Sequence, residues 1–134
     1  MIKVLGVEHI GVALNKNEEL SNLFKNIFNL EYLGSEVVEE QGVNTDIFNV
    51  SNTKIELLES ISKDSPISKY ISKHGQGMHH IALIVEDIRS AIKYLIENNI
   101  EMIDTDPKTG VEGYQIAFIH PKSTPGLLIE ICQK

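Results

Sequence analysis

The chain has 134 residues, a formal net charge of −7 and a single cysteine. This length suits one domain or two small fused halves, and the acidic charge disfavours a nucleic-acid partner. One cysteine excludes an intrachain disulfide, and no apolar run approaches the roughly 18 residues of a transmembrane helix. Because the first residues also lack the pattern of a signal peptide, we expect a soluble, cytoplasmic protein without a membrane partner.

The first half of the chain opens on a predicted strand at residues 8–14, where a histidine precedes a β-rich apolar run. A helix follows, because apolar side chains recur at the spacing of an amphipathic stripe: Leu20, Leu23, Phe24, Ile27 and Phe28. Asn15 or Asn17 is its predicted N-cap. Three strands complete this half, and the turn between the last two predicts a hairpin: residues 33–39, 45–50 and 53–58.

A helical linker at residues 60–77 joins the halves. Pro66 is a favoured first residue of a helix, and Asp64 or Ser65 before it is a suitable cap. The apolar side of this helix is predicted to consist of Ile67, Tyr70 and Ile71. Two glycines after residue 74 end the helix and lead into the second half.

The second half repeats the order of the first. A histidine-led strand at residues 79–85 precedes a helix that Asp87 caps, with the stripe Ile88, Ala91, Ile92, Leu95 and Ile96. Strands are predicted at residues 100–103, 113–119 and 126–132. The chain therefore predicts an α+β fold of two tandem βαβββ modules, the first at residues 1–59 and the second at 78–134.

Histidine and glutamate recur at matching points of the two modules. The first strands carry His9 and His80, and the last strands carry Glu56 and Glu130, at nearly equal offsets. Glu130 shares its strand face with Leu128 and Cys132, and an ionised carboxylate among apolar neighbours is costly unless it is paired or bound to a metal. A single such residue is usually satisfied by hydrogen bonds, but the repeat predicts that all four line one cavity.

Two imidazoles and two carboxylates suit a borderline divalent ion such as Zn, Co, Ni, Mn or Fe(II), and they leave coordination positions open. We expect His79 to point away from the strand face of His80, either outward or in support of the site. His74 is expected to cap the linker helix or to be solvated. His120 precedes a proline in a loop, where a structural role is favoured over support of the site. Cys132 is expected to be a small buried hydrophobic residue.

With these motifs the sequence resembles the vicinal oxygen chelate superfamily, in which two βαβββ modules form an open, U-shaped mixed sheet around a metal. Within it, the chain most resembles the methylmalonyl-CoA epimerases. The resemblance covers the whole chain and is carried by five stretches: residues 40–43, 64–67, 77–82, 120–123 and 126–130. It implies one divalent ion per chain (Co, Zn, Ni or Mn), a homodimer, an acyl-CoA substrate, and the metal ligands His9, Glu56, His80 and Glu130.

The implied reaction interconverts (R)- and (S)-methylmalonyl-CoA. Removal of the α-proton creates an enolate, whose charge the metal stabilises, and two bases on opposite faces exchange the proton. Glu130 is the first candidate base and Glu56 its partner. In some epimerases a glutamate at the position of Thr45 is proposed to act as one of the bases. This chain has threonine there, so Asp46, the next residue, is the runner-up to Glu56 as the second base.

Three other functions are compatible with the same fold. A glyoxalase I-type lactoylglutathione lyase uses a His/Glu/His/Glu set, which Glu56 matches, although the linker and the Gly77–His80 stretch favour the epimerase. A metal-free binding protein, such as a bleomycin-sequestering protein, would lack the ligands. An extradiol dioxygenase would need two histidines and one glutamate on Fe(II), which leaves Glu56 without a role.

Overall fold

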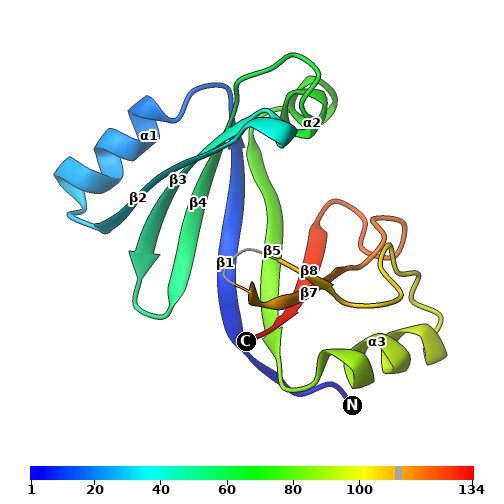
Figure 1. Ribbon diagram of the computed structural model, residues 1–134. Helices are drawn as coiled ribbons and strands as arrows, with labels where there is room; N and C mark the ends of the chain where they lie inside the picture. Colours follow the sequence, from blue (N-terminus) through cyan, green and yellow to red (C-terminus); the bar gives the residue numbers. More distant parts are fainter. Residues whose placement is uncertain (111–112) are drawn as a thin grey trace. The chain divides into compact units, whose positions relative to one another are not determined.

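The computed structural model describes residues 1–110 and 113–134, apart from the side chain of residue 40 (Figure 1). Its strands are β1 (Val4–Leu14), β2 (Glu31–Val38), β3 (Val43–Val50), β4 (Thr53–Ser60), β5 (Gly77–Val85), β6 (Lys108–Thr109), β7 (Gln115–Phe118) and β8 (Leu128–Gln133). Its helical elements are α1 (Glu18–Asn22), the π-helix η1 (Leu23–Ile27), the 3-10 helix η2 (Glu39–Gln41), α2 (Pro66–His74) and α3 (Ile88–Glu97).

The strands are hydrogen-bonded in the order β2-β3-β4-β1-β5-β8-β7-β6. The sheet is open, because β2 and β6 end that order, and mixed, because β8 runs parallel to β5 and antiparallel to β7. The predicted α+β fold with an open mixed sheet is thereby confirmed. By internal contacts the residues group into two compact units, Ile10–His79 and the combination of Met1–His9 with His80–Lys134.

In the unit Ile10–His79, the two faces of the sheet pack against different helical elements. One face buries a cluster with α2, made of Ala13, Val43, Leu58 and Ile67. The opposite face carries Phe48 and Leu57, which are both fully buried. Phe24 of η1 meets Phe48 edge-on, with ring centroids 5.3 Å apart. Since neighbouring residues of a strand point to opposite faces, these contacts assign every side chain of β3 and β4 to a face.

The predicted caps hold for two helices and fail for one. Ser65 accepts a hydrogen bond from the Ser68 amide ahead of α2, and Asp87 does the same for the Ser90 amide ahead of α3. Asn17 precedes α1 but makes no capping bond, since its own backbone is already helical, and its Nδ2 donates to two backbone carbonyls, those of Asn44 and Leu57. No helix in the described ranges has both the length and the apolar character needed to cross a lipid bilayer.

The first predicted helix differs from the expected amphipathic one. After one turn of α-helix it continues as η1, a π-helix, whose wider turn shifts side chains around the axis. As a result Ile27 and Phe28, which an α-helical stripe would bury, are 73% and 61% exposed. The apolar stripe predicted from the 3.6-residue period is therefore wrong at its C-terminal end.

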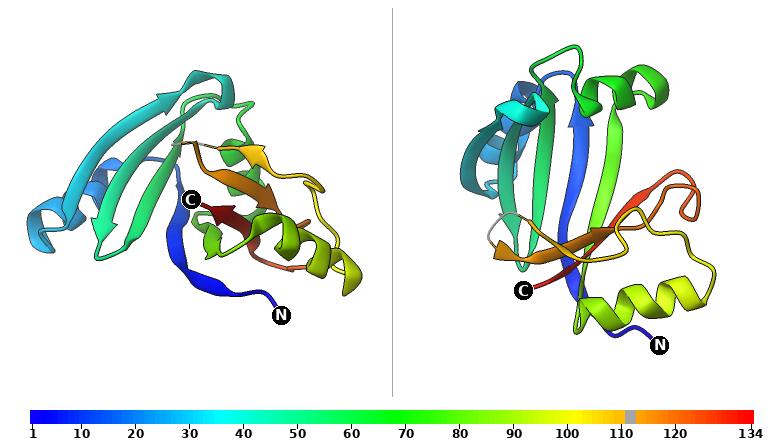
Figure 2. Two further views of the ribbon diagram at one scale, coloured as in Figure 1. Left: turned by 60° about the horizontal axis from the view of Figure 1, so that its bottom comes forward. Right: turned by 45° about the vertical axis from the view of Figure 1, so that its right-hand side comes forward.

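In the unit of residues 1–9 and 80–134, α3 packs against β7 and β8 (Figure 2). The core between them contains Val85, Ile88, Ala91, Ile92, Met102, Ala117, Ile119 and Ile131. The strand predicted at residues 100–103 is wrong, since this segment makes only an isolated bridge between Met102 and Ile119. The short strand β6 pairs with β7 instead.

Candidate metal-binding site

His9 on β1 and His80 on β5 bring their ring nitrogens together. Their Nε2 atoms lie 2.9 Å apart, and the rings meet at 86° with centroids 5.0 Å apart. The two strands are hydrogen-bonded neighbours that run side by side (Figures 1 and 2). The matching histidines of the two predicted modules therefore converge.

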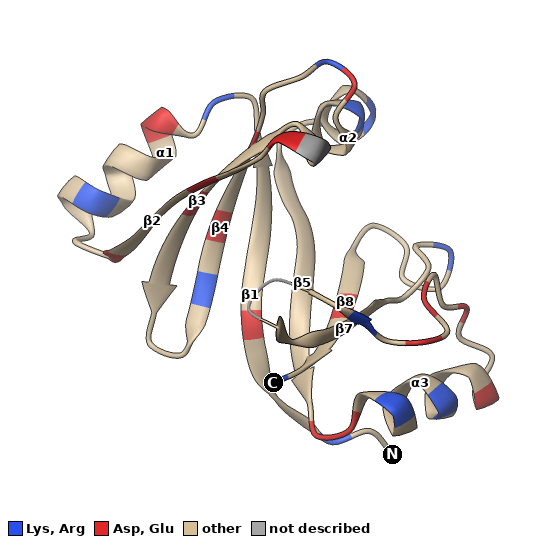
Figure 3. Cartoon of the chain, viewed as in Figure 1, with Lys and Arg blue, Asp and Glu red and all other residues tan. Residues whose placement is uncertain are grey.

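Glu130 lies on β8 and shares a face of the sheet with His80. In the parallel β5–β8 pair, His80 stands opposite Leu128 and Ala82 stands opposite Glu130. Because His80 and Ala82 are two residues apart, as are Leu128 and Glu130, all four project from one face. Glu130 is only 7% exposed. Figure 3 shows acidic residues in red on several strands, β8 among them. A buried carboxylate and two imidazoles thus belong to the same unit.

Glu56 lies on β4 in the other unit, where it is half-buried. It stands opposite Ile47 of β3 and projects from the face that carries Leu58. Asp46 stands opposite Leu57, so its side chain projects from the other face, where Ser35 donates a hydrogen bond to its carboxylate. The strand register therefore argues against Asp46 as a substitute for Glu56.

Glu8 is a further acidic residue of this region that sequence reasoning missed. Its Oε1 lies 3.2 Å from Nδ1 of His9, and its Oε2 lies 3.6 Å from Nζ of Lys134. Glu8 directly precedes His9 in β1 and is only 6% exposed. Because strand faces alternate, the two side chains were expected to point apart. The sequence signal that could have revealed the contact was a carboxylate within an apolar strand, where an ionised group needs a partner.

Cys132 is buried as predicted, and its environment makes the thiol unreactive. Burial raises its pKa to about 11, and the nearby carboxylates of Glu130 and Glu8 act in the same direction, while Lys134 opposes them. The thiol is therefore protonated at neutral pH, which makes it a poor nucleophile.

The remaining histidines have packing or hydrogen-bonding roles. His79 is half-buried and meets the ring of Tyr70 edge-on, with centroids 4.7 Å apart, and burial lowers its pKa. His74 is exposed at the end of α2 and also lies against Tyr70. Nδ1 of His120 accepts a hydrogen bond from the amide of Lys122, as expected for a residue that orders this loop.

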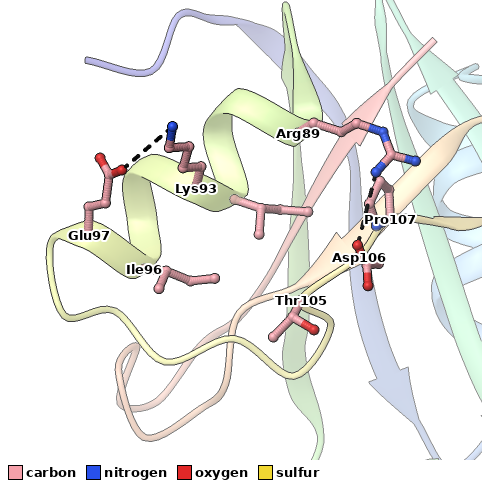
Figure 4. Close-up of a pocket in the computed structure, with 8 residues that line it drawn as sticks. Arg89, Lys93, Ile96, Glu97, Thr105, Asp106 and Pro107 are labelled. Atoms are coloured by element: carbon pink, nitrogen blue, oxygen red, sulfur yellow. Dashed lines mark ion pairs between the residues drawn. The ribbon is translucent and has the colours of Figure 1, made fainter.

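A cavity of about 380 Å³ lies beside α3, where it contains none of the predicted site residues (Figure 4). It is lined by Arg89, Ile92, Lys93, Ile96, Glu97, Thr105, Asp106 and Pro107. Its cations already face anions, since Arg89 pairs with Asp106 and Lys93 with Glu97, each at 4.0 Å. These ion pairs are solvent-exposed, so they hold little energy and define no strong site for a charged ligand.

The donor atoms of the histidine pair fit a divalent metal ion. Nitrogen ligands bind Zn at about 2.0–2.1 Å, so two nitrogens on adjacent coordination positions lie about 3 Å apart. The 2.9 Å between the Nε2 atoms of His9 and His80 matches that separation. A buried carboxylate from Glu130 on the same face as His80 is a further oxygen donor of the kind that such ions accept.

Similarity to known proteins places this chain in a defined class. The sequence profile of the Glyoxalase/Bleomycin resistance protein/Dioxygenase superfamily matches residues 8–118, and the chain belongs to that superfamily. The chain is 36% identical to an uncharacterised protein of Bacillus subtilis over 95% of this chain and 91% of that protein. It is 38% identical to the mitochondrial methylmalonyl-CoA epimerase of Dictyostelium discoideum, over 96% of this chain and 78% of that one.

A solved structure gives the same relationship in three dimensions. The structure of a methylmalonyl-CoA epimerase in complex with methylmalonyl-CoA and NH4+ has a TM-score of 0.83 and 28% sequence identity. The match covers 98% of this chain and 96% of that one. The resemblance to the epimerases is thereby confirmed at the level of sequence and of fold.

Proposed function

We propose that this protein is a cytoplasmic, metal-dependent epimerase that interconverts (R)- and (S)-methylmalonyl-CoA. The observation that carries the proposal is the convergence of His9 and His80 in a unit that also buries Glu130. The relatives named methylmalonyl-CoA epimerase supply the substrate class, because they match nearly the whole chain.

In this proposal His9, Glu56, His80 and Glu130 hold one divalent ion, of the Co, Zn, Ni or Mn type. Such an ion would supply a Lewis acid for the negative charge that develops on the thioester oxygen. Glu130 accepts the α-proton from C2 of the substrate through a carboxylate oxygen, and a second carboxylate returns a proton to the opposite face of C2. Glu56 is the proposed second group, supported by the strand register that argues against Asp46.

The test follows the α-proton of each epimer separately. Purified protein is incubated in D2O with (R)- or (S)-methylmalonyl-CoA as purified, after metal removal by a chelator, and after a divalent metal is added back. Interconversion is expected to fall on the order of 10²-fold on metal removal, because the loss of a Lewis acid costs several kcal/mol of transition-state stabilisation, and to return with the metal. NMR measures deuterium incorporation and the ratio of epimers.

Two outcomes would contradict the proposal in different ways. Undiminished interconversion in metal-free protein would remove the metal from the reaction. Failure to interconvert the epimers, together with turnover of a glutathione hemithioacetal in the same preparations, would favour the glyoxalase I-type activity over the epimerase.

The proposal includes a homodimer. In the described part of the chain, one edge of β2 has no neighbouring strand, and such an edge can pair with another chain. Apolar side chains are also exposed on β2 and the segment before it: Ile27, Phe28, Leu33 and Val37. A second copy would cover this surface, so sedimentation is expected to give twice the 15.0 kDa of one chain. A mass of 15.0 kDa at micromolar concentration would contradict the dimer.

A further inference from the structure

The contacts of Glu8 decide which nitrogen of His9 carries a proton. An ionised carboxylate only accepts hydrogen bonds, so the 3.2 Å contact between Oε1 of Glu8 and Nδ1 of His9 requires a proton on Nδ1. In a neutral imidazole this leaves the lone pair on Nε2. That nitrogen is the one directed at Nε2 of His80, 2.9 Å away.

The carboxylate of Glu8 is itself held in place. Its second oxygen, Oε2, lies 3.6 Å from Nζ of Lys134, whose ammonium group also lies 5.5 Å from the ring centroid of Tyr114. Glu8 is 6% exposed, and its buried charge is therefore compensated by a cation rather than by bulk water. The row Lys134–Glu8–His9 restricts the direction of the imidazole as well as its tautomer.

Glu8 cannot act as another ligand of an ion bound at Nε2 of His9, because it occupies the Nδ1 side of the same ring. We propose that Glu8 is the positioning residue of the metal site, which holds His9 in its Nδ1-protonated form with Nε2 available to the ion, and that Lys134 holds Glu8. This inference rests on the metal site of the proposed function. Glu8 and Lys134 are not among the predicted metal ligands, and the sequence repeat does not mark either of them.

The test measures metal affinity by competition with a chromophoric chelator, without substrate. Glu8→Ala removes the acceptor, so the dissociation constant is expected to rise about 10- to 100-fold, the usual effect of losing a hydrogen-bond partner of a ligating histidine. Glu8→Gln keeps an acceptor oxygen without the charge, so its affinity is expected to lie between wild type and Glu8→Ala. Lys134→Met should weaken binding less than Glu8→Ala does.

Two controls separate positioning from folding. Glu86→Gln removes an exposed carboxylate that pairs with Lys3 at 3.9 Å, and its metal affinity is expected to equal that of wild type. Nitrogen-15 NMR of the histidine rings reports the tautomer directly, and the Nδ1-protonated form of His9 is expected in wild type and Glu8→Gln but not in Glu8→Ala. If Glu8→Ala fails to fold, Glu8→Gln and the wild-type ring spectrum still decide the matter.

The possible failures are distinguishable. Wild-type metal affinity in Glu8→Ala, or an Nε2-protonated His9 in wild type, would overturn the role of Glu8 and leave the epimerase proposal intact. A wild-type protein that binds the metal with the expected dependence on Glu8 but does not interconvert the epimers would overturn the proposed function alone. A protein that binds no divalent ion would overturn both.

Discussion

Glu130→Gln is expected to lower the rate of epimerisation by about 10²- to 10⁴-fold, the range for loss of a positioned acid–base group. The amide cannot accept the α-proton, whereas its carbonyl oxygen can still approach a metal ion. Metal content is therefore expected to fall much less than the rate. The buried position of Glu130 on the face shared with His80 is the structural reason to choose this carboxylate.

The measurement is deuterium incorporation at C2 from each epimer in D2O, combined with metal analysis of the same sample. Glu101→Gln is the matched control, because it changes an exposed glutamate of the same unit that pairs with Lys122 at 3.9 Å. This control is expected to exchange at the wild-type rate. Wild-type exchange in Glu130→Gln, with both epimers as substrate, would exclude Glu130 as a base.

His80→Ala is expected to abolish stoichiometric metal binding and to lower the epimerisation rate on the order of 10²-fold, as metal removal does, because the Lewis-acid contribution is lost with the ion. The physical reason is that Nε2 of His80 lies 2.9 Å from Nε2 of His9. The substitution removes the second of these two nitrogen ligands. Bound metal is measured by elemental analysis of protein dialysed against a known concentration of the ion.

The adjacent histidine provides the control for this experiment. His79→Ala removes an imidazole that packs on Tyr70 rather than on His9, so its metal content is expected to stay at the wild-type level even if its thermal stability falls. Full metal occupancy in His80→Ala would show that the ion is held elsewhere, and the proposed ligand set would be wrong.

The sequence predicted those parts of the fold that depend on local chemistry. Ser65 and Asp87 cap their helices as expected, because a short side chain with an acceptor oxygen before a helix satisfies free amides whatever the tertiary context. Asn17 had the same local signal, but its side-chain amide instead donates hydrogen bonds to the backbone carbonyls of Asn44 and Leu57, which are distant in sequence. Long-range hydrogen bonds of this kind leave no periodic trace in the sequence.

The errors of the predicted fold come from departures from ideal periods. The spacing of the apolar residues before Phe28 fits an α-helix, and a π-helical turn changes which of them are buried without changing their identity. Residues 100–103 have an apolar pattern that suits a strand, but burial of Met102 in the α3 core needs only an isolated bridge. An apolar sequence pattern indicates that a segment is buried, but it does not show whether the segment forms the backbone hydrogen bonds of a strand.

The candidate site was predictable where it depended on the repeat. Symmetry between the modules singled out His9 and His80, and their nitrogens do converge. Glu8 has no counterpart to mark it, since His79 occupies the matching position before His80. Its role depends on a side-chain rotamer that carries the carboxylate around to Nδ1 of its neighbour, which strand alternation does not describe.

The two ends of the strand order differ in a way that limits assembly. β2 presents an edge of eight residues, whereas β6 at the opposite end has only two. An edge that pairs with its own copy about a twofold axis is consumed in both partners at once, and a two-residue edge is too short to recruit another chain. In the proposed dimer, pairing of the two β2 edges would therefore leave only the two-residue β6 edges at the ends of the described strand order, and such short edges would stop growth into fibres.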